Sequence, residues 1–339
     1  MTGLEGRRIL VTGGAGFIGS QLVTTLLDAT GAAHVRVLDS LATGHLENLA
    51  HLHDHVEAGR LQVRVGDIVT DSPDALDDVD VVFHLACLGV RHSLHDPMGN
   101  HRVNAEGTLA LLQEALRRDV DRFVHVSSSE VYGTARYAPM DEGHPTCPET
   151  VYGGSKLAGE AYARAHFRTY GMPVVVARPF NTYGPRSHFE GDSGEVIPRS
   201  IVRALCGLPA LVFGDGEQTR DFTHVRDTAA GLVALAQCDA ALGETVNLGS
   251  GSEVSINDLA TLVAGIVGLE GPAATHLDPR PGDVRRLIVD DSLMRSLTGW
   301  RPGVDFADGV EDLVGWFRTR QQSPEEMLAR IEDRNWVPA

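Results

Sequence analysis

The alternation of apolar and polar positions predicts strands and helices that follow one another through the first half of the chain. Apolar runs of strand length are separated by longer segments in which apolar residues recur at helical spacing. The expected strands are residues 8–11, 35–38, 61–65, 79–85, 123–127 and 174–177, and the longest expected helices are 17–29, 103–118 and 152–170. Nearly continuous apolar strands between helices are typical of a parallel sheet covered on both faces. We therefore expect an α/β fold built on a doubly wound parallel sheet.

The pattern changes after Pro179, where Gly, Pro and Asp become frequent. The elements expected here are a helix over 227–237, a strand over 245–248, and helices over 256–267 and 306–320. We interpret this half as a smaller α/β domain that is interleaved with the first one. The first domain is expected over residues 1–180 together with about 225–255, and the second over 181–224 and 256–339.

Composition and charge narrow the range of partners and compartments. The 339 residues are 42% hydrophobic and 22% charged, which is ordinary for a globular protein. The net charge of −17 repels phosphate backbones and anionic bilayers, so we expect neither a nucleic-acid nor a membrane partner. No apolar run reaches the roughly 18 residues of a transmembrane helix, and the N-terminus lacks a signal-peptide pattern. Four cysteines without CxxC spacing are expected to be reduced thiols, which favours a cytoplasmic protein.

A glycine-rich turn links the first expected strand to the first expected helix. Gly13, Gly16 and Gly19 lie within the run from Thr12 to Gly19. Glycines allow a tight turn and let the backbone approach a pyrophosphate, which then binds at the helix N-terminus. An acidic residue, Asp39, follows the second strand 20 residues past Gly19, at the distance expected for a ribose-binding carboxylate. These features predict a Rossmann-type dinucleotide site.

The surroundings of Asp39 favour NAD over NADP. A carboxylate accepts hydrogen bonds from ribose hydroxyls and would repel a 2′-phosphate. Residues 40–50 contain no Lys or Arg that could bind such a phosphate. Asp67, after the third strand, is expected to flank the adenine. NAD is therefore the predicted cofactor.

Tyr152 and Lys156 are the candidate catalytic pair. Their i, i+4 spacing puts both side chains on one helix face. A tyrosine with a pKa near 10 is a poor base at neutral pH, and a nearby ammonium together with a positive nicotinamide ring would favour its phenolate form. Of the 29 basic residues, Lys156 is the only lysine, which suits a compact contact with ribose hydroxyls. Upstream, Ser128 and Glu130 follow the strand over 123–127, at the strand end where ligands bind in open α/β sheets.

With these motifs, the chain resembles the extended short-chain dehydrogenase/reductase family, which contains nucleotide-sugar epimerases and dehydratases. The resemblance spans nearly the whole chain. It includes the three glycines, the His84-Leu85-Ala86 strand motif, Asn104 with Gly107-Thr108, and the Ser128–Tyr152–Lys156 set. It continues through Arg178-Pro179-Phe180-Asn181, Tyr183-Gly184-Pro185, the segment around Arg220, and Arg280-Pro281-Gly282-Asp283.

The resemblance implies two sets of binding residues. The implied NAD-binding residues are Gly13, Gly16, Phe17, Ile18, Gly19, Asp39, Asp67, Ile68, Leu85, Ala86, Asn104, Tyr152, Lys156 and Pro179. The implied residues for a nucleotide-sugar substrate are Arg91, Ser129, Asn181, Arg186, Val196, Ile197, Arg220, Arg280 and Asp283. Arg220 and Arg280 would bind the diphosphate through charge-assisted hydrogen bonds, which provides the basic pocket that an acidic chain needs for an anionic ligand.

The reaction implied by the resemblance starts with removal of the 4-hydroxyl proton by Tyr152 while NAD takes hydride from carbon 4. An epimerase then returns the hydride to the other face of the 4-keto intermediate. The loop Gly89-Val90-Arg91 with Ser93 and the long stretch 184–201 resemble 4-epimerases, and a UDP-sugar is the favoured substrate. Glu130 resembles instead a residue of dehydratases and uronate decarboxylases, because an extra carboxylate near carbon 5 serves β-elimination. We predict an epimerase, with a 4,6-dehydratase as the alternative, and less favoured a UDP-uronate decarboxylase or a non-catalytic NAD-binding protein.

Two further expectations concern assembly and metals. Family members commonly pair two helices per subunit, and the segments 103–118 and 152–170 predict a homodimer through such a four-helix bundle. Histidines cluster at 51–55 and 92–101, but i, i+2 spacing does not share a helix face. The chemistry implied by the resemblance needs no metal, and none is predicted.

Overall fold

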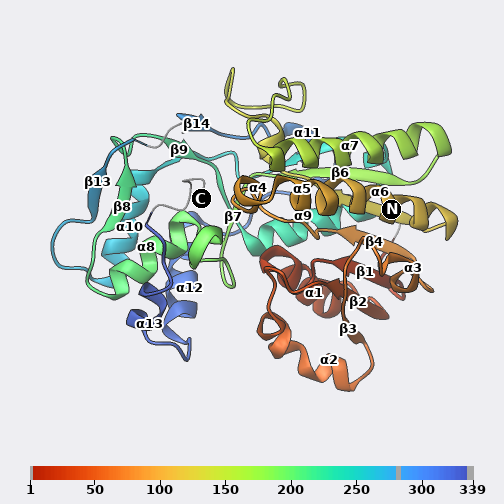
Figure 1. Ribbon diagram of the computed structural model, residues 1–339, viewed down its shortest axis with the longest axis horizontal. Helices are drawn as coiled ribbons and strands as arrows, with labels where there is room; N and C mark the ends of the chain where they lie inside the picture. Colours follow the sequence, from red (N-terminus) through yellow and green to blue (C-terminus); the bar gives the residue numbers. More distant parts are fainter. Residues whose placement is uncertain (1–2, 280–283, 334–339) are drawn as a thin grey trace.

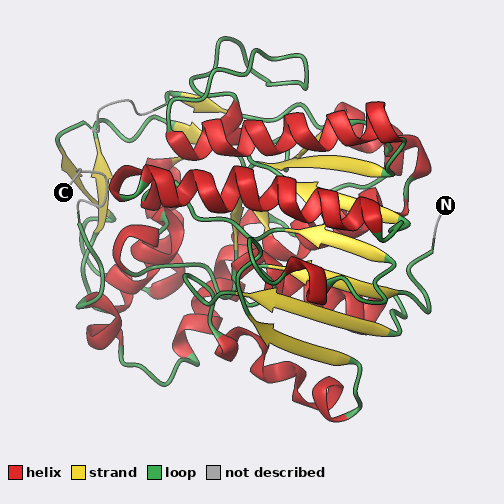
Figure 2. Cartoon of the chain, turned by 45° about the vertical axis from the view of Figure 1, so that its right-hand side comes forward, coloured by secondary structure: helices red, strands yellow, loops and turns green. Residues whose placement is uncertain are grey.

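The computed structural model describes residues 3–279 and 284–333, and it centres on a seven-stranded sheet in which every pair of neighbours is parallel. The strand order is β11-β6-β5-β4-β1-β2-β3. The strands are β1 (Arg8–Thr12), β2 (His34–Asp39), β3 (Leu61–Val65), β4 (Val81–His84), β5 (Arg122–Val126), β6 (Val174–Pro179) and β11 (Thr245–Leu248). Figure 2 shows these strands running alongside one another behind two long helices. The predicted α/β fold with a doubly wound parallel sheet is confirmed.

Helices cover both faces of this sheet because alternate strand residues point to opposite sides. Ile9 and Val11 of β1 belong to the core under α1 (Phe17–Ala29) and α9 (Val225–Gln237). Leu10, between them, belongs to the core on the opposite face. That second core lies under α3 (Ser72–Ala75), α6 (Thr108–Arg117) and α7 (Val151–Tyr170).

The helix expected over 103–118 is divided into two parts. A π-helical turn over Arg102–Gly107 precedes α6, which begins at Thr108. A π turn holds one residue more than an α turn and occurs often at functional sites. Here it contains Asn104, whose amide contacts the loop after β4: Leu88 N–H donates to Asn104 Oδ1 at 2.8 Å, and Asn104 Nδ2 donates to Leu88 O at 2.9 Å.

The second domain packs three helices around a parallel strand pair, at the left of Figure 1. Its helices are α8 (Val196–Leu205), α10 (Ile256–Val267) and α12 (Phe306–Arg318), followed by α13 (Pro324–Leu328), and its strand pair is β8 (Ala210–Phe213) with β13 (Ala274–Leu277). The buried residues of these helices and of β8 form a separate hydrophobic core. Two small sheets connect the domains: β7 (Asn181–Tyr183) with β10 (Phe222–His224), and β9 (Thr219–Arg220) with β12 (Val254–Ser255) and β14 (Arg286–Leu287).

The remaining short helices lie in the connections of the first domain. They are α2 (His53–Glu57), α4 (His92–His95), α5 (Pro97–His101) and α11 (Ser292–Thr298). Although the sequence pattern assigns 256–339 to the second domain, Met294 of α11 and Trp300 are buried in the core of the first. The chain therefore returns to the large sheet after β14. Within residues 3–279 and 284–333, no helix combines the length and apolarity needed to cross a membrane.

Candidate active site

One cavity of about 1370 Å³ follows the carboxyl ends of the strands and continues into the second domain. Ligands bind at this edge of open α/β sheets because the strand order reverses there and leaves a crevice. The end of β1, the loops after β2, β3, β4 and β5, and the start of α7 line its first half. β7, α8, β8, β9 and the segment from Val284 to Leu287 line its second half.

The turn between β1 and α1 has the geometry that a pyrophosphate requires. Gly13 has φ of +72°, and a Cβ atom there would lie 2.7 Å from the backbone N of Ala86. A Cβ atom on Gly19 would lie 2.1 Å from the carbonyl oxygen of Gly13, so neither position accepts a side chain. α1 begins at Phe17 with no side chain capping its first turn and no acidic residue within it. Its N-terminal N–H groups therefore present a positive end to the cavity.

Asp39 shapes the adjoining part of the cavity. Its carboxylate accepts from Ala15 N–H at 2.9 Å and from Leu41 N–H at 2.8 Å, which fixes it at the end of β2. Each carboxylate oxygen can accept more than one hydrogen bond, so the group can still bind ribose hydroxyls. The same cavity is also lined by Phe17, Ile18, Asp67, Ile68, Leu85, Ala86 and, at the end of β6, Pro179. These residues fit a dinucleotide with an unphosphorylated ribose.

The candidate catalytic residues converge from two segments. α7 begins at Val151, because Thr150 caps the helix by accepting from Gly153 N–H at 3.1 Å. This start places Tyr152 and Lys156 on the first two turns, facing the cavity. Ser128 begins the short turn after β5, and its Oγ accepts from Glu130 N–H at 3.2 Å. Ser128, Glu130, Tyr152 and Lys156 all line the same cavity.

Lys156 is buried and held by the end of β5, and Tyr152 lies one turn before it on α7. Lys156 is 2% exposed, and its Nζ donates to Val126 O at 2.6 Å. Burial lowers the pKa of Lys156, while Cys87 and Glu160 oppose that shift. Burial raises the pKa of Tyr152, with contributions from Cys87 and the Glu130 carboxyl, and the hydroxyl of Ser128 opposes them. Tyr152 is therefore protonated in the ligand-free site, and the expected phenolate requires charge that a ligand brings.

Glu130 lines the same cavity, and its charged neighbours shift the pKa of its carboxyl in opposite directions. Burial by the surrounding protein raises the pKa of its carboxyl, Arg91 and Arg220 lower it, and Glu149 adds to the rise. Ser129, beside it, is 6% exposed and also lines the cavity. The motif thus offers one carboxyl and two hydroxyls to a bound sugar.

A buried polar network holds the catalytic segment from behind. Asn104 Nδ2 donates to the hydroxyl of Ser155, one residue before Lys156, at 3.1 Å. On β4, His84 contacts Thr12 Oγ1 at 2.7 Å and Thr108 Oγ1 at 2.8 Å. Burial, with the charge of Lys156, lowers the pKa of His84 to about 3, so the ring stays neutral. These contacts tie α7 and the π turn to the sheet, although Asn104 itself does not line the cavity.

Six of the nine predicted substrate-binding residues line the cavity. Arg91, Ser129, Asn181, Val196, Ile197 and Arg220 line the cavity. Arg280 and Asp283 lie outside the described residues. Arg186 is described but does not line the cavity.

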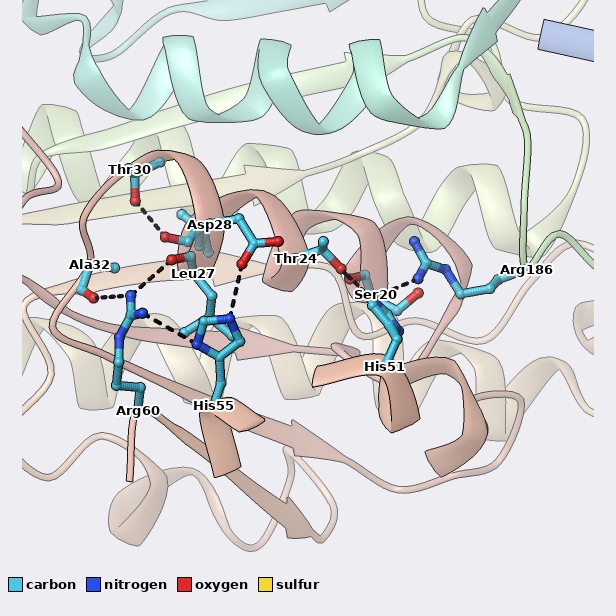
Figure 3. Close-up of polar contacts among 11 residues, drawn as sticks. Ser20, Thr24, Leu27, Asp28, Thr30, Ala32, His51, His55, Arg60 and Arg186 are labelled. Carbon is cyan, nitrogen blue, oxygen red and sulfur yellow. Dashed lines mark hydrogen bonds and ion pairs between the residues drawn. The ribbon is translucent and has the colours of Figure 1, made fainter. Parts of the chain in front are cut away.

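Arg186 faces α1 instead, as Figure 3 shows. Its NH2 donates to Gln21 Oε1 at 2.6 Å and its NH1 to His51 Nε2 at 3.2 Å. Arg186 has a φ of +73°, a backbone conformation that is uncommon for residues other than glycine. Burial lowers the pKa of the Arg186 guanidinium to about 10. Arg186 therefore connects the crossover between the domains to α1 and does not line the cavity in which substrate binding was predicted.

Several cavity residues were not predicted from the sequence. Cys87, Glu195, Arg199 and Arg203 line the cavity. The i, i+4 spacing of Arg199 and Arg203 is a signal that they share a face of α8, but it does not show that this face meets the cavity. Glu195 carries no such signal, and only the fold shows that burial raises its pKa to about 8. Within residues 3–279 and 284–333, no group of three or more His, Cys, Asp or Glu side chains could hold a metal ion.

Along most of its length the chain is similar to epimerases and dehydratases. Residues 10–313 match the protein family described as GDP-mannose 4,6 dehydratase. A putative UDP-glucose 4-epimerase of Methanocaldococcus jannaschii is 37% identical over 318 residues, covering 93% of this chain and 100% of that protein. A dTDP-glucose 4,6-dehydratase of Actinoplanes sp. is 37% identical over 322 residues, covering 93% and 98%. A crystal structure of dTDP-glucose 4,6-dehydratase from Streptomyces venezuelae with NAD bound is 34% identical, with a TM-score of 0.84 over 92% of this chain and 97% of that one.

Proposed function

The chain belongs to the GDP-mannose 4,6-dehydratase family of extended short-chain dehydrogenases/reductases, and we propose that it is an NAD-dependent nucleotide-sugar 4-epimerase. A UDP-sugar is the favoured substrate, in line with the M. jannaschii relative. The second candidate is a 4,6-dehydratase, which Glu130 favours.

The residues of the chain have distinct roles in this reaction. Tyr152 accepts the proton of the sugar's 4-hydroxyl, Ser128 holds that oxygen through a hydrogen bond, and Lys156 binds the ribose of the cofactor. When bound, NAD supplies the hydride acceptor for carbon 4 and a positive ring that favours the phenolate form of Tyr152. After the keto sugar rotates in the cavity, carbon 4 would take the hydride back on its other face while Tyr152 returns the proton to the oxygen at carbon 4. The reaction needs no further acid or base.

We favour an epimerase over a dehydratase because the Ser128-Ser129-Glu130 motif contains a single carboxyl. Elimination across carbons 5 and 6 requires a base for the carbon-5 proton and an acid for the 6-hydroxyl. Glu130 supplies one such group next to Ser128, and its neighbour in the motif is the hydroxyl of Ser129. A motif with one carboxyl supports epimerisation, which needs neither group, more than elimination, which needs both.

Glu130→Gln tests this proposal against its alternative. The wild-type protein is incubated with UDP-, dTDP-, GDP- and ADP-sugars, and the products are identified by NMR and mass spectrometry. An epimerase gives products of unchanged mass and retains most of its rate as Glu130→Gln. A dehydratase gives products that have lost water, and its Glu130→Gln variant accumulates NADH absorbance after the first hydride transfer. A product that has lost carbon dioxide would indicate a decarboxylase and contradict both readings.

We also propose that the enzyme is a homodimer formed through α6 and α7. Figure 2 shows these two helices side by side over one face of the sheet. α7 carries exposed apolar side chains at both ends: Val151 is 44% and Tyr170 57% exposed. Light scattering at micromolar concentration should give twice the chain mass of 36.4 kDa. A monomer mass would contradict the proposed dimer but not the proposed reaction.

A further inference from the structure

We propose that Arg199 binds the diphosphate of the substrate, and that the backbone of Glu332 and Asp333 near the C-terminus holds its guanidinium in the substrate half of the cavity. This inference rests on the proposed function, because it takes the ligand to be a nucleoside diphosphate group. It adds a third arginine to the two that the sequence motifs indicate.

Arg199 and Arg203 lie one turn apart on α8, and both line the cavity. Arg199 is 9% exposed, and its NH2 donates to Glu332 O at 2.7 Å and to Asp333 O at 3.2 Å. Carbonyl oxygens are neutral, so they orient the guanidinium without cancelling its charge. The other N–H groups of Arg199 can bind an anion through charge-assisted hydrogen bonds.

The segment that holds Arg199 is itself attached to the rim of the cavity. Gly191 N–H donates to Arg330 O at 2.8 Å, and Arg330 NH2 lies 3.3 Å from Glu190 Oε1. The Arg330 guanidinium also lies over the ring of Phe189, 5.6 Å from its centre. Met327 is buried in the core of the second domain, and Ile331 packs against that core. The loop before α8 and the end of the chain therefore form one packed unit.

Gly194 leaves room for the Arg199 side chain in this unit. A Cβ atom on Gly194 would lie 2.9 Å from Arg199 Cδ and 2.7 Å from Phe189 O. Neither contact is possible without a shift of Arg199 or of the loop backbone. The Arg199 side chain thus packs against the loop at Gly194, and its guanidinium is held by the carbonyls of Glu332 and Asp333.

The charges around Arg199 favour an anionic ligand. Burial lowers the pKa of the Arg199 guanidinium, and the charges of Arg91 and Arg203 add to this shift. The carboxylates of Asp333 and Glu332 oppose it. Several guanidinium groups that share a partly buried site repel one another, and a bound anion relieves that repulsion. Three arginines face two carboxylates here, and one of these carboxylates lies 3.6 Å from Arg203 NH1. In a chain with a net charge of −17, even this small positive excess is a local feature of the site.

Calorimetry with UDP, dTDP and GDP as probes, and with uridine as the uncharged reference, tests the binding role. Arg199→Ala should weaken binding of the nucleoside diphosphate by about tenfold or more, because a charge-assisted hydrogen bond is lost. Uridine binding and the NAD content should not change, and Arg199→Lys should recover part of the loss. Arg318→Ala, which removes an exposed arginine from α12, is the matched control. Unchanged diphosphate affinity in Arg199→Ala would overturn the inference.

Two truncated chains test the holding role. A chain ending at Ile331 lacks both carbonyls, whereas one ending at Asn335 keeps both as neutral peptide carbonyls. The shorter chain should lose diphosphate affinity and the longer one should not. Combined with Arg199→Ala, the truncation should have no further effect, since it acts through Arg199. An equal loss in both backgrounds would contradict the holding role.

Measurements of folding and of turnover show whether a loss of binding comes from misfolding, and whether the proposed function or this inference has failed. Should the chain ending at Ile331 fail to fold, as judged by thermal unfolding and NAD content, Gly194→Ala replaces it. That variant displaces the Arg199 side chain, and its effect on diphosphate affinity should be smaller in the Arg199→Ala background, where only the contact with the Phe189 backbone remains. Diphosphate binding without turnover of any sugar nucleotide would contradict the proposed function and leave this inference standing. Absence of any diphosphate binding to the wild-type protein would overturn both.

Discussion

The two halves of the cavity are built in different ways. The cofactor half uses the ends of neighbouring strands, β1, β2, β4 and β5, together with one glycine turn. The substrate half combines β7, α8, β8, β9 and the segment before β14 with the end of the chain. Backbone geometry and short side chains dominate the first half, whereas long arginine side chains from separate segments dominate the second. The first half is therefore fixed by a single sheet, and the second depends on how several segments pack.

The largest expected effect on activity comes from substituting Tyr152, which lies where the two halves of the cavity meet. Tyr152→Phe removes the proton acceptor and should lower kcat by about 10²–10⁴-fold. UDP affinity should stay near that of the wild type, because the substrate half keeps all of its binding groups. Tyr170→Phe, at the exposed end of the same helix, is the control. An active Tyr152→Phe enzyme would remove Tyr152 from the mechanism.

Gly13→Ala should weaken NAD binding without weakening UDP binding. The φ of +72° is strained for alanine, and its Cβ would meet the backbone of Ala86. A strain of about 1–3 kcal/mol predicts that NAD affinity falls by roughly tenfold or more, measured by the NAD retained after purification. UDP affinity should be unchanged. Gly315→Ala is the control, because a Cβ there has no atom within 4 Å. Equal losses of NAD and UDP would show that the two halves are not independent.

Glu195→Gln should alter the pH dependence of stability in the substrate half. Burial raises the pKa of Glu195 from 4.5 to about 8. Between these values the unfolded chain releases the proton while the folded chain retains it, so the free energy of unfolding falls as pH rises. Glutamine has no such proton. Thermal unfolding should give a higher Tm for Glu195→Gln than for the wild type at pH 8 and equal values near pH 4.5. A difference that is the same at both pH values would contradict the raised pKa.

The smallest expected effect is that of Arg186→Ala on substrate binding. Its guanidinium contacts Gln21 and His51 outside the cavity, so UDP affinity should change less than about twofold, as for a residue that makes no ligand contact. Arg220→Ala, which removes an arginine from the cavity, should weaken UDP binding more. Calorimetry on the two variants compares them directly. A larger loss from Arg186→Ala than from Arg220→Ala would contradict the orientation of Arg186.

Much of the cofactor half could be predicted from the sequence because its signals are local. Gly13, Gly19 and Asp39 lie in a strand–turn–helix–strand unit, where spacing along the chain determines spacing in space. Tyr152 and Lys156 are likewise fixed to one helix face by their separation of four residues. The boundaries of the helix over 103–118 were less predictable, because the π turn at Asn104 depends on contacts with the loop after β4.

The sequence by itself determined the parallel sheet and its glycine turn, and it placed Tyr152 and Lys156 on one helix face, since periodicity and short spacings specify these features. Only the tertiary structure decided the direction of Arg186, the ammonium contact of Lys156, the return of 292–300 to the first core and the convergence of Arg199 with the chain end. Arg199 and Asp333 are 134 residues apart. No local pattern specifies such a contact, because it depends on the packing of α8, α12 and α13 around a common core.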